Sequence, residues 1–260
     1  MSKELTTTNQ TEFIIPTENN EIPVDELDGF TLSFDKVKIP AGGTTAFEVP
    51  GDDPENPDIE KELKVIIVDQ YASNAFYKNA YDGTENAPDC FSNDGHQGIN
   101  KDGEIINCDN CPNNRYGSAI DGIGKACKNM RKVYILRSGD TFPMLLTLPA
   151  TSLAPFGKYL QRIVSKGLRP CDVITKISLK KAESKGGITY AQATFTMEEV
   201  LPPEMREKVR KYATGMKKTT RIIALLILTI FLSACDSSLF TGKKYIIKYY
   251  DGDNLVYKYG

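Results

Sequence analysis

Four cysteines between residues 90 and 127 constrain this chain more than any other feature of its sequence. They follow the pattern Cys90-x17-Cys108-x2-Cys111-x15-Cys127, and Pro112 directly follows the close pair. Zinc prefers four soft ligands in a tetrahedron, and a C-x2-C turn can supply two thiolates from one knuckle. The pattern therefore predicts a structural Zn²⁺ site. A site closed by four thiolates has no open position for water or substrate, so it performs no chemistry of its own.

Other interpretations of these cysteines stay open. Disulfides would need an oxidising compartment, and residues 1–26 are polar and lack the apolar stretch of a secretion signal. Free cysteines in a core are a second alternative, but Asp109, Pro112 and two asparagines after it favour a turn around the close pair. His96, the only histidine, could replace Cys90 as fourth ligand, although its neighbours indicate an exposed turn.

Charge is distributed unevenly along the 260 residues, whose net charge is −2. Residues 1–100 carry −14, residues 101–215 carry +8 and residues 216–260 carry +4. A basic second half favours an anionic partner, although the acidic and basic halves could equally face each other in the fold.

Catalytic motifs are missing from the sequence. No G-x-S-x-G, H-E-x-x-H or calcium-loop pattern occurs, and the segment around Gly122 and Gly124 lacks the first glycine and the Ser or Thr of a phosphate loop. With one histidine in a turn, histidine-dependent activation of a nucleophile is not expected. We therefore expect a binding protein rather than an enzyme.

Hydrophobic patterning predicts a mainly β domain with two helices. Strands are expected at 30–40, 45–49, 63–68, 133–136 and 144–148, with a hairpin formed by 174–181 and 188–197. A cap at Thr151 or Ser152 and an apolar stripe predict a helix to Lys166, and a second helix is expected from Pro203 to about Tyr212. This content favours a small β-barrel or sandwich with a turn-rich insertion at about residues 82–128.

A second unusual feature begins at Met216. The stretch MKKTTRIIALLILTIFLSACDSS has a basic start, an apolar run, and a bacterial lipobox pattern ending in Cys235, which would be lipidated on processing. About 13 apolar helical residues cover roughly 20 Å, which is short for a hydrocarbon core of roughly 30 Å. Residues 216–235 therefore resemble a lipoprotein signal peptide more than a membrane span. Two apolar-rich runs around Asp251-Gly252 then predict a short hairpin within 236–260.

Three explanations of this segment compete. It could join two reading frames, tether a soluble domain to a membrane, or form a core helix. We favour the joining of two units. In this interpretation residues 1–26 are a flexible tail, 27–215 are the working domain in the cytoplasm of a bacterial host, and membrane association arises only if residues 216–235 function as a signal or tether.

Basic and aromatic side chains surround the cysteines. Proteins that hold single-stranded nucleic acid combine a positive groove with aromatic faces on which bases stack. Core packing is the competing explanation for each aromatic. The candidate contacts are Arg115, Tyr116, Lys125, Lys128, Arg131 and Lys132 near the cysteines, Tyr77 and Tyr81 before them, and Lys158, Tyr159 and Arg162 on the first expected helix.

The succession NAFYKNAY, PDCFSNDG, CDNCPNNRYGSA, GIGKACKNMRKVYIL and PMLLTLPATSLAPFGKYL resembles phage-encoded single-stranded DNA-binding proteins of replication and recombination. It resembles more loosely the zinc-containing helix-destabilising protein of T-even phages. The resemblance covers about residues 27–200. It implies an OB-fold with a zinc-bearing insertion, single-stranded DNA as ligand, and phage replication or recombination proteins as partners.

Two departures from this family matter. The T-even protein binds zinc through one His and three Cys, whereas this chain offers four Cys. Such proteins often end in an acidic tail that recruits partners, whereas a basic stretch and a lipobox follow here. The alternative functions are a membrane-tethered, lipoprotein-like interaction protein and a zinc-ribbon accessory factor that binds other proteins.

Overall fold

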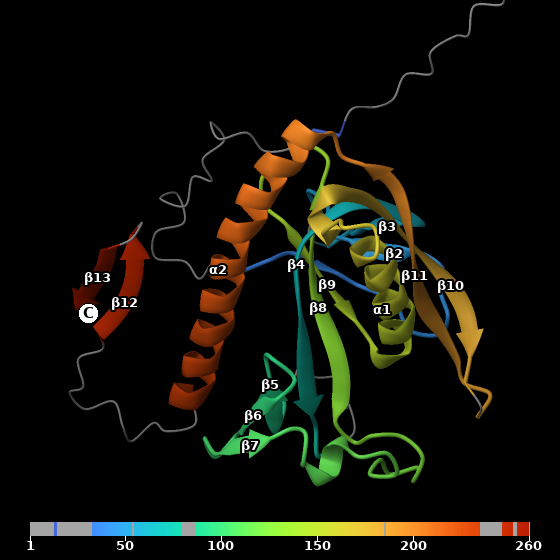
Figure 1. Cartoon of the computed structure of the whole chain (residues 1–260). Coiled ribbons are helices and arrows are strands. Elements are labelled where there is room, and N and C mark those ends of the chain that lie inside the picture. The colour runs from blue at the N-terminus through green and yellow to red at the C-terminus, as the bar shows by residue number, and fades with distance from the viewer. Residues whose placement is uncertain are drawn as a thin grey trace, which may run out of the picture.

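The structure is a computed structural model of the whole chain. It describes residues 13–14, 33–53, 55–79, 87–184, 186–234, 246–251 and 254–259, with side chains up to residue 220. Its main body is a β-sheet with one helix on each face (Figure 1). The predicted class, mainly β with two helices, is confirmed.

One long strand, β4, organises the sheet. It pairs antiparallel with β8 along most of its length, with β10 near its start and with β5 at its end. The resulting order of the body is β1-β9-β8-β4-β10-β11, and β1 runs parallel to β9. The strands are β1 (Lys36–Val37), β4 (Glu62–Phe76), β8 (Lys128–Arg137), β9 (Met144–Leu148), β10 (Val173–Glu183) and β11 (Thr189–Val200). Among the described strands β1 and β11 do not pair, so the sheet does not close into a barrel.

The strand predicted at 63–68 is part of β4, which continues to Phe76. The sequence does not reveal this length because Val65 to Val68 are all buried, which removes the alternation that marks a half-exposed strand. A β-bulge between Ile67 and Asp69 then shifts the register against β8. The predicted strand at 144–148 and the hairpin of β10 and β11 are confirmed.

Helix α1 (Ala150–Val164) covers one face of the sheet and confirms the first predicted helix. The expected cap is wrong. Pro149 precedes the helix without a side-chain cap, and the Ser152 hydroxyl instead accepts a hydrogen bond of 3.0 Å from the backbone N–H of Ala193 on the edge strand β11. The core beneath α1 contains Phe47, Val49, Leu63, Val65, Ile135, Leu146, Phe156, Ile163 and Ile177, all at most 1% exposed.

Helix α2 (Pro203–Ala234) covers the opposite face and extends well beyond the expected end near Tyr212. Val209, Ala213 and Met216 pack on a second core that includes Ile66, Val68, Tyr71, Tyr134 and Leu136. The fully buried Thr220 donates a hydrogen bond of 2.8 Å from its hydroxyl to Asp69 Oδ2 on β4. Residues 216–220, the start of the signal-like segment, are therefore part of this packed layer. The helix continues because the single Gly215 costs only about 1 kcal/mol in a helix, and the packing of Met216 and the hydrogen bond of Thr220 hold the next turn against the sheet.

The remaining elements are small. Strand β2 (Phe47–Val49) pairs antiparallel with β3 (Asp58–Glu60). Strands β12 (Ile246–Asp251) and β13 (Asn254–Tyr259) pair antiparallel, as the Asp-Gly signal predicts. No helix in the described part of the chain is long and apolar enough to cross a membrane.

The predicted turn-rich insertion lies between the end of β4 and the start of β8, away from the two helix-covered cores (Figure 1). It begins with a meander of β5 (Cys90–Ser92), β6 (Gln97–Asn100) and β7 (Ile105–Asn107), and continues through a 3₁₀ helix at Pro112–Asn114 (η2) to the start of β8. Because β5 pairs with residues 74–76 of β4, the insertion extends the main sheet rather than hanging from a linker.

Candidate metal and nucleic-acid site

The fold brings the four predicted cysteines to one pocket of about 380 Å³ in the insertion. Cys90 begins β5, Cys108 follows β7, Cys111 precedes η2 and Cys127 precedes β8. All four are free thiols. Strand pairing therefore brings together thiols from residues that are up to 37 positions apart in the sequence.

The thiols are close enough to influence one another. Cys90 Sγ and Cys108 Sγ lie 3.1 and 3.4 Å from the point where a Cβ on Gly98 would stand, so a side chain at residue 98 would crowd both sulfurs. Burial and then the neighbouring Cys108 and Cys111 thiols raise the pKa of Cys127 to about 11. The same causes raise the pKa of Cys90.

The arrangement of the side chains does not by itself identify a metal site. Within the described residues, no three His, Cys, Asp or Glu side chains converge as ligands of one ion. The donor types and their common pocket nevertheless fit zinc, which would need the sulfurs to rotate to about 2.3 Å from a shared centre. Zinc thus stays a prediction at this site.

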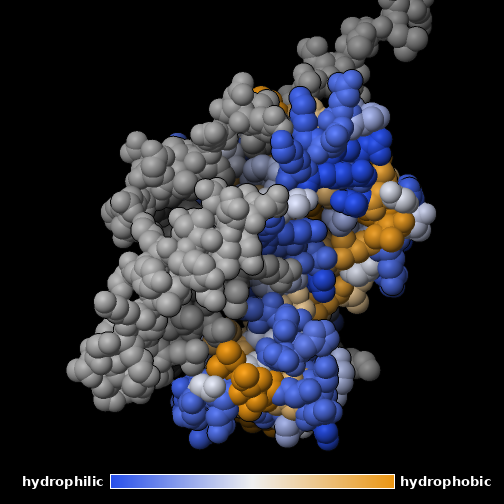
Figure 2. Space-filling model, turned by 60° about the vertical axis from the view of Figure 1, so that its left-hand side comes forward, coloured by the Kyte–Doolittle hydropathy of each residue, from blue (hydrophilic) through white to orange (hydrophobic). Residues whose placement is uncertain are grey.

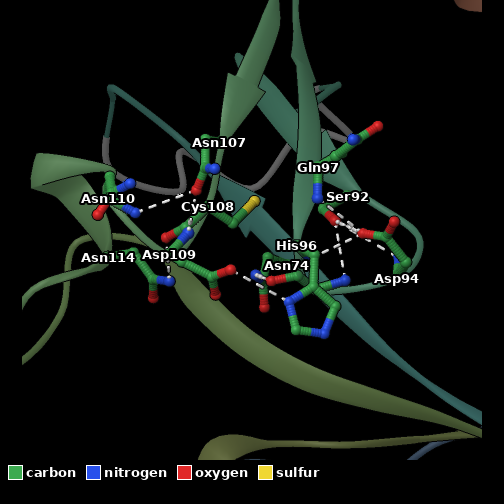
Figure 3. Close-up of polar contacts among 11 residues, drawn as sticks. Asn74, Ser92, Asp94, His96, Gln97, Asn107, Cys108, Asp109, Asn110 and Asn114 are labelled. Atoms are coloured by element: carbon green, nitrogen blue, oxygen red, sulfur yellow. Dashed lines mark hydrogen bonds and ion pairs between the residues drawn. The ribbon is translucent and has the colours of Figure 1, made fainter.

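The turn between Cys108 and Cys111 is fixed by asparagine side chains (Figure 3). Asn107 Oδ1 accepts hydrogen bonds from the backbone N–H groups of Asp109 at 2.9 Å and Asn110 at 3.2 Å. Asn114 Nδ2 donates to the Cys108 carbonyl at 2.8 Å. Asn side chains readily form hydrogen bonds with backbone groups in such turns. The shape of this knuckle is therefore fixed by hydrogen bonds within the protein itself.

His96 lies in an exposed turn, as its neighbours indicate, and does not line the cysteine pocket. Its backbone N–H donates to Asp94 Oδ1 at 2.7 Å, and its Nδ1 lies 3.3 Å from Asp109 Oδ2 (Figure 3). The ring therefore faces a carboxylate of the knuckle rather than the four sulfurs. Nothing in this geometry favours His96 over Cys90 as a ligand.

In two places the ammonium group of a candidate lysine lies over the ring of a candidate tyrosine. Lys128 Nζ lies 5.0 Å from the Tyr77 ring centroid, and Lys125 Nζ lies 5.2 Å from that of Tyr116. Tyr116 is 84% exposed and Tyr77 is 37% exposed. These distances are typical of cation–π contacts. The Tyr77–Lys128 pair depends on strand register, because Ala75 of β4 lies opposite Lys128 of β8.

An amide network connects this region to the cysteine knuckle. Lys125 Nζ donates to Asn114 Oδ1 at 3.2 Å and to Asn129 Oδ1 at 3.0 Å. Asn129 Nδ2 in turn donates to Asn74 Oδ1 at 2.8 Å and to Asn114 Oδ1 at 2.9 Å. The network joins β4, β8 and the knuckle. Sequence reasoning missed these asparagines, and only the Asn-rich run after the C-x2-C pair hints at them.

The basic residues of β8 do not form one groove. Arg131 lines a pocket of about 340 Å³ between α1 and the insertion, and its Nε donates to Gln70 Oε1. Successive residues of a strand point to opposite faces, so Lys128 and Lys132 lie on the other face. Lys132 Nζ donates there to Thr147 Oγ1 at 3.3 Å. Arg131 therefore does not share a face of the sheet with Lys128 and Lys132.

Tyr159 is also misassigned. It is 4% exposed in the core beneath α1, where its hydroxyl hydrogen-bonds Thr175 Oγ1 at 2.6 Å, so its ring cannot stack on a base. Arg115, Lys158 and Arg162 are exposed, but none of them lines either pocket. Tyr81 lies outside the described residues.

The insertion itself is not basic. Residues 87–128 carry four Lys and Arg against six Asp and Glu, whereas residues 129–215 carry 15 against seven. The excess positive charge of the second half therefore belongs to the sheet and helices. Any strong attraction for an anion must involve the body of the protein.

Comparison of this chain with family models, with curated proteins and with solved structures gives no match. Its function has to be inferred from the residues described above.

Proposed function

We propose that this protein binds single-stranded DNA with little sequence preference, in phage DNA replication or recombination. The observation that carries the proposal is the pair of tyrosine–lysine contacts at the end of the β4–β8 ribbon. An exposed ring stacks on any base, and an ammonium beside it neutralises a neighbouring phosphate. Neither contact reads base identity, so the expected binding is tolerant of sequence.

The strand order supports an OB-fold for the body. Strands β4, β8 and β9 are followed by α1 and then by β10 and β11, and β4 pairs with both β8 and β10. This is the succession of five strands and a helix expected of an OB-fold, a partly open Greek-key barrel that binds oligonucleotides. In this assignment the insertion is the loop between the first two strands, one of the loops used for binding.

Zinc has a structural role in this proposal. Cys90, Cys108, Cys111 and Cys127 would hold the ion as thiolates and thereby lock the insertion. Asn114 links the Cys108 carbonyl to Lys125, so the locked knuckle would support the Tyr116–Lys125 contact. The chain's own residues would do the binding, and the metal would only fix the loop that presents them.

The other functions considered are less well supported. The side chains of residues 221–235 lie outside the described part of the chain, so nothing there argues for a membrane tether or for lipidation of Cys235. We propose action in the cytoplasm of a bacterial host, with phage replication or recombination proteins as further partners.

A fluorescence anisotropy titration with an end-labelled oligothymidylate tests the proposal. We expect binding that weakens steeply as salt rises. Replacing Lys125 and Lys128 with Ala should lower the affinity, whereas Lys101→Ala, which removes a charge already paired with Asp89 at 3.5 Å, is the matched control in the same insertion. Absence of binding at low salt, or binding that ignores salt, would refute the proposed function.

A further inference from the structure

Lysines of β8 and of the β1 segment lie on the face of the sheet opposite α1, with a threonine of β9 between them. Lys132 of β8 lies directly opposite Thr147 of β9, and its Nζ donates to the Thr147 hydroxyl oxygen at 3.3 Å. On β1, Lys36 lies beside Leu145 and Val37 lies beside Leu146.

The alternation of the extended backbone fixes which way Lys36 of β1 and the following Lys38 point. Val37 and Leu146 are buried in the core beneath α1, so their neighbours project to the opposite face. Lys36 and Lys38 are both exposed on that face. The sequence carries the signal for this arrangement in the segment FDKVKIP, where the two lysines are two residues apart.

In the part of the chain that the structure describes, no ion pair involves Lys36, Lys38 or Lys132, whereas Lys64 and Lys101 each contact a carboxylate. The side chain of Lys132 is half-buried, and burial followed by the nearby charge of Lys36 lowers its pKa. Holding two cations together with one of them dehydrated costs free energy. Such a cost is typical of a functional site.

We propose that Lys132, Lys36 and Lys38, together with the Thr147 hydroxyl, bind a phosphate group of the nucleic-acid backbone. Because Thr147 Oγ1 accepts a hydrogen bond from Lys132, its own O–H is free to donate to a phosphate oxygen. Ammonium groups bind phosphate as point charges and need no fixed angular fit. The inference rests on the proposed DNA binding and adds a second contact region outside the insertion.

This site also defines the path of the bound strand. Lys128, which lies over the Tyr77 ring, is on the same face as Lys132 and four residues away along β8, or about 13 Å. On this face α2 packs over β4, so a strand that stacks on Tyr77 would pass along β8 beside α2 to reach Lys132 and β1. Arg131 would be left on the opposite face, away from the bound strand.

The salt dependence of DNA binding by the full chain tests this inference. Each phosphate contact with single-stranded DNA contributes about 0.7 to the slope of log K against log salt. The double variant Lys36→Met with Lys132→Met removes two of the lysines that share this one phosphate, so it should reduce that slope by about 0.7. Lys64→Met with Lys101→Met changes the net charge equally but removes lysines that are already ion-paired, and it should leave the slope within about 0.3 of the unaltered chain. A slope in the first variant that matches the control would overturn the site.

A second arm separates this inference from the proposed function. Inorganic phosphate is titrated into the full chain and followed by the ammonium NMR signals of the lysines. If DNA does not bind but phosphate shifts the Lys132 signal, the anion site stands, with free phosphate as its source, and the DNA-binding function fails. If DNA binds and the slope is unchanged in Lys36→Gln with Lys132→Gln as well as in the Met variant, only the inference fails. Thermal unfolding of each variant confirms that it is folded.

Discussion

Gly98 offers a sharp test of the metal centre because it lies between two of the sulfurs. A Cβ at residue 98 would stand 3.1 Å from Cys90 Sγ, 3.4 Å from Cys108 Sγ and 3.3 Å from the Phe91 carbonyl oxygen. The carbonyl belongs to β5, which is paired on both sides and cannot easily move. In Gly98→Ala the Cys90 sulfur, the closer of the two, must therefore yield by a few tenths of an ångström.

That displacement should matter for zinc. Metal–ligand distances tolerate about 0.2 Å of error, and forcing an extra methyl into a packed site costs about 1–3 kcal/mol. Since about 1.4 kcal/mol corresponds to a tenfold change in affinity, we expect Gly98→Ala to weaken zinc binding by about 5- to 150-fold. The protein should still bind one zinc per chain at saturation.

The measurement is competition for zinc against a chromogenic chelator of known affinity, with the metal-free chain as starting material. Gly124→Ala is the control, since an added Cβ there meets only ordinary contacts, the nearest being Ala119 Cβ at 3.6 Å. Equal zinc affinities of the two variants would show that Cys90 and Cys108 do not share a metal beside Gly98. A chain that binds no zinc at all would refute the metal centre itself.

Three further predictions concern other parts of the molecule. Thr220→Val removes a buried hydroxyl that donates to an aspartate on β4, so urea unfolding should show that the free energy of unfolding falls by about 2 kcal/mol. The control Thr219→Val, at a half-buried residue, should change the free energy of unfolding by less than about 0.5 kcal/mol. Equal losses in the two variants would mean that α2 does not pack on β4 at this point. Tyr116→Ala should weaken oligothymidylate binding by about 1–3 kcal/mol in an anisotropy titration without changing the salt slope, and an altered slope would contradict a stacking role. Burial by itself raises the pKa of Asp172. Hydrogen bonds from Arg210 and from the Arg169 backbone lower it by more than burial raises it, so the pKa of Asp172 lies below the ordinary value of 3.8. The stability it contributes is therefore present above pH 3.8 and lost as pH falls through the lower folded value; in Arg210→Met acid unfolding should begin at higher pH, and an unchanged acid limb would refute the pairing.

Local sequence patterns were sufficient to predict several helices and strands. The hairpin of β10 and β11, strand β9 and helix α1 were predictable because each is marked by a short periodic run and flanking turn residues. The end of α2 and the length of β4 were not predictable. Packing on a neighbour, rather than intrinsic propensity, keeps Met216 to Thr220 helical and buries both faces of β4 at Val65 to Val68.

The candidate site, too, was predictable from the sequence only in part. Its cysteine spacing and its tyrosines and lysines are visible in the sequence, but their grouping is not. Arg131 and Lys132 are adjacent in the chain and lie on opposite faces of β8, whereas Tyr77 and Lys128 are 51 residues apart and touch. Tyr116 and Tyr159 look alike in sequence, yet one is 84% and the other 4% exposed.

The sequence by itself determined the mainly β class, the two helices and the set of four cysteines between residues 90 and 127, because these depend on periodicity and spacing along the chain. Only the tertiary structure decided which lysines share a surface, which tyrosine is accessible, and how far α2 belongs to the fold. Those outcomes depend on the register between β4 and β8, on its shift at the bulge after Ile67, and on packing between distant segments. None of these is encoded in a single local stretch.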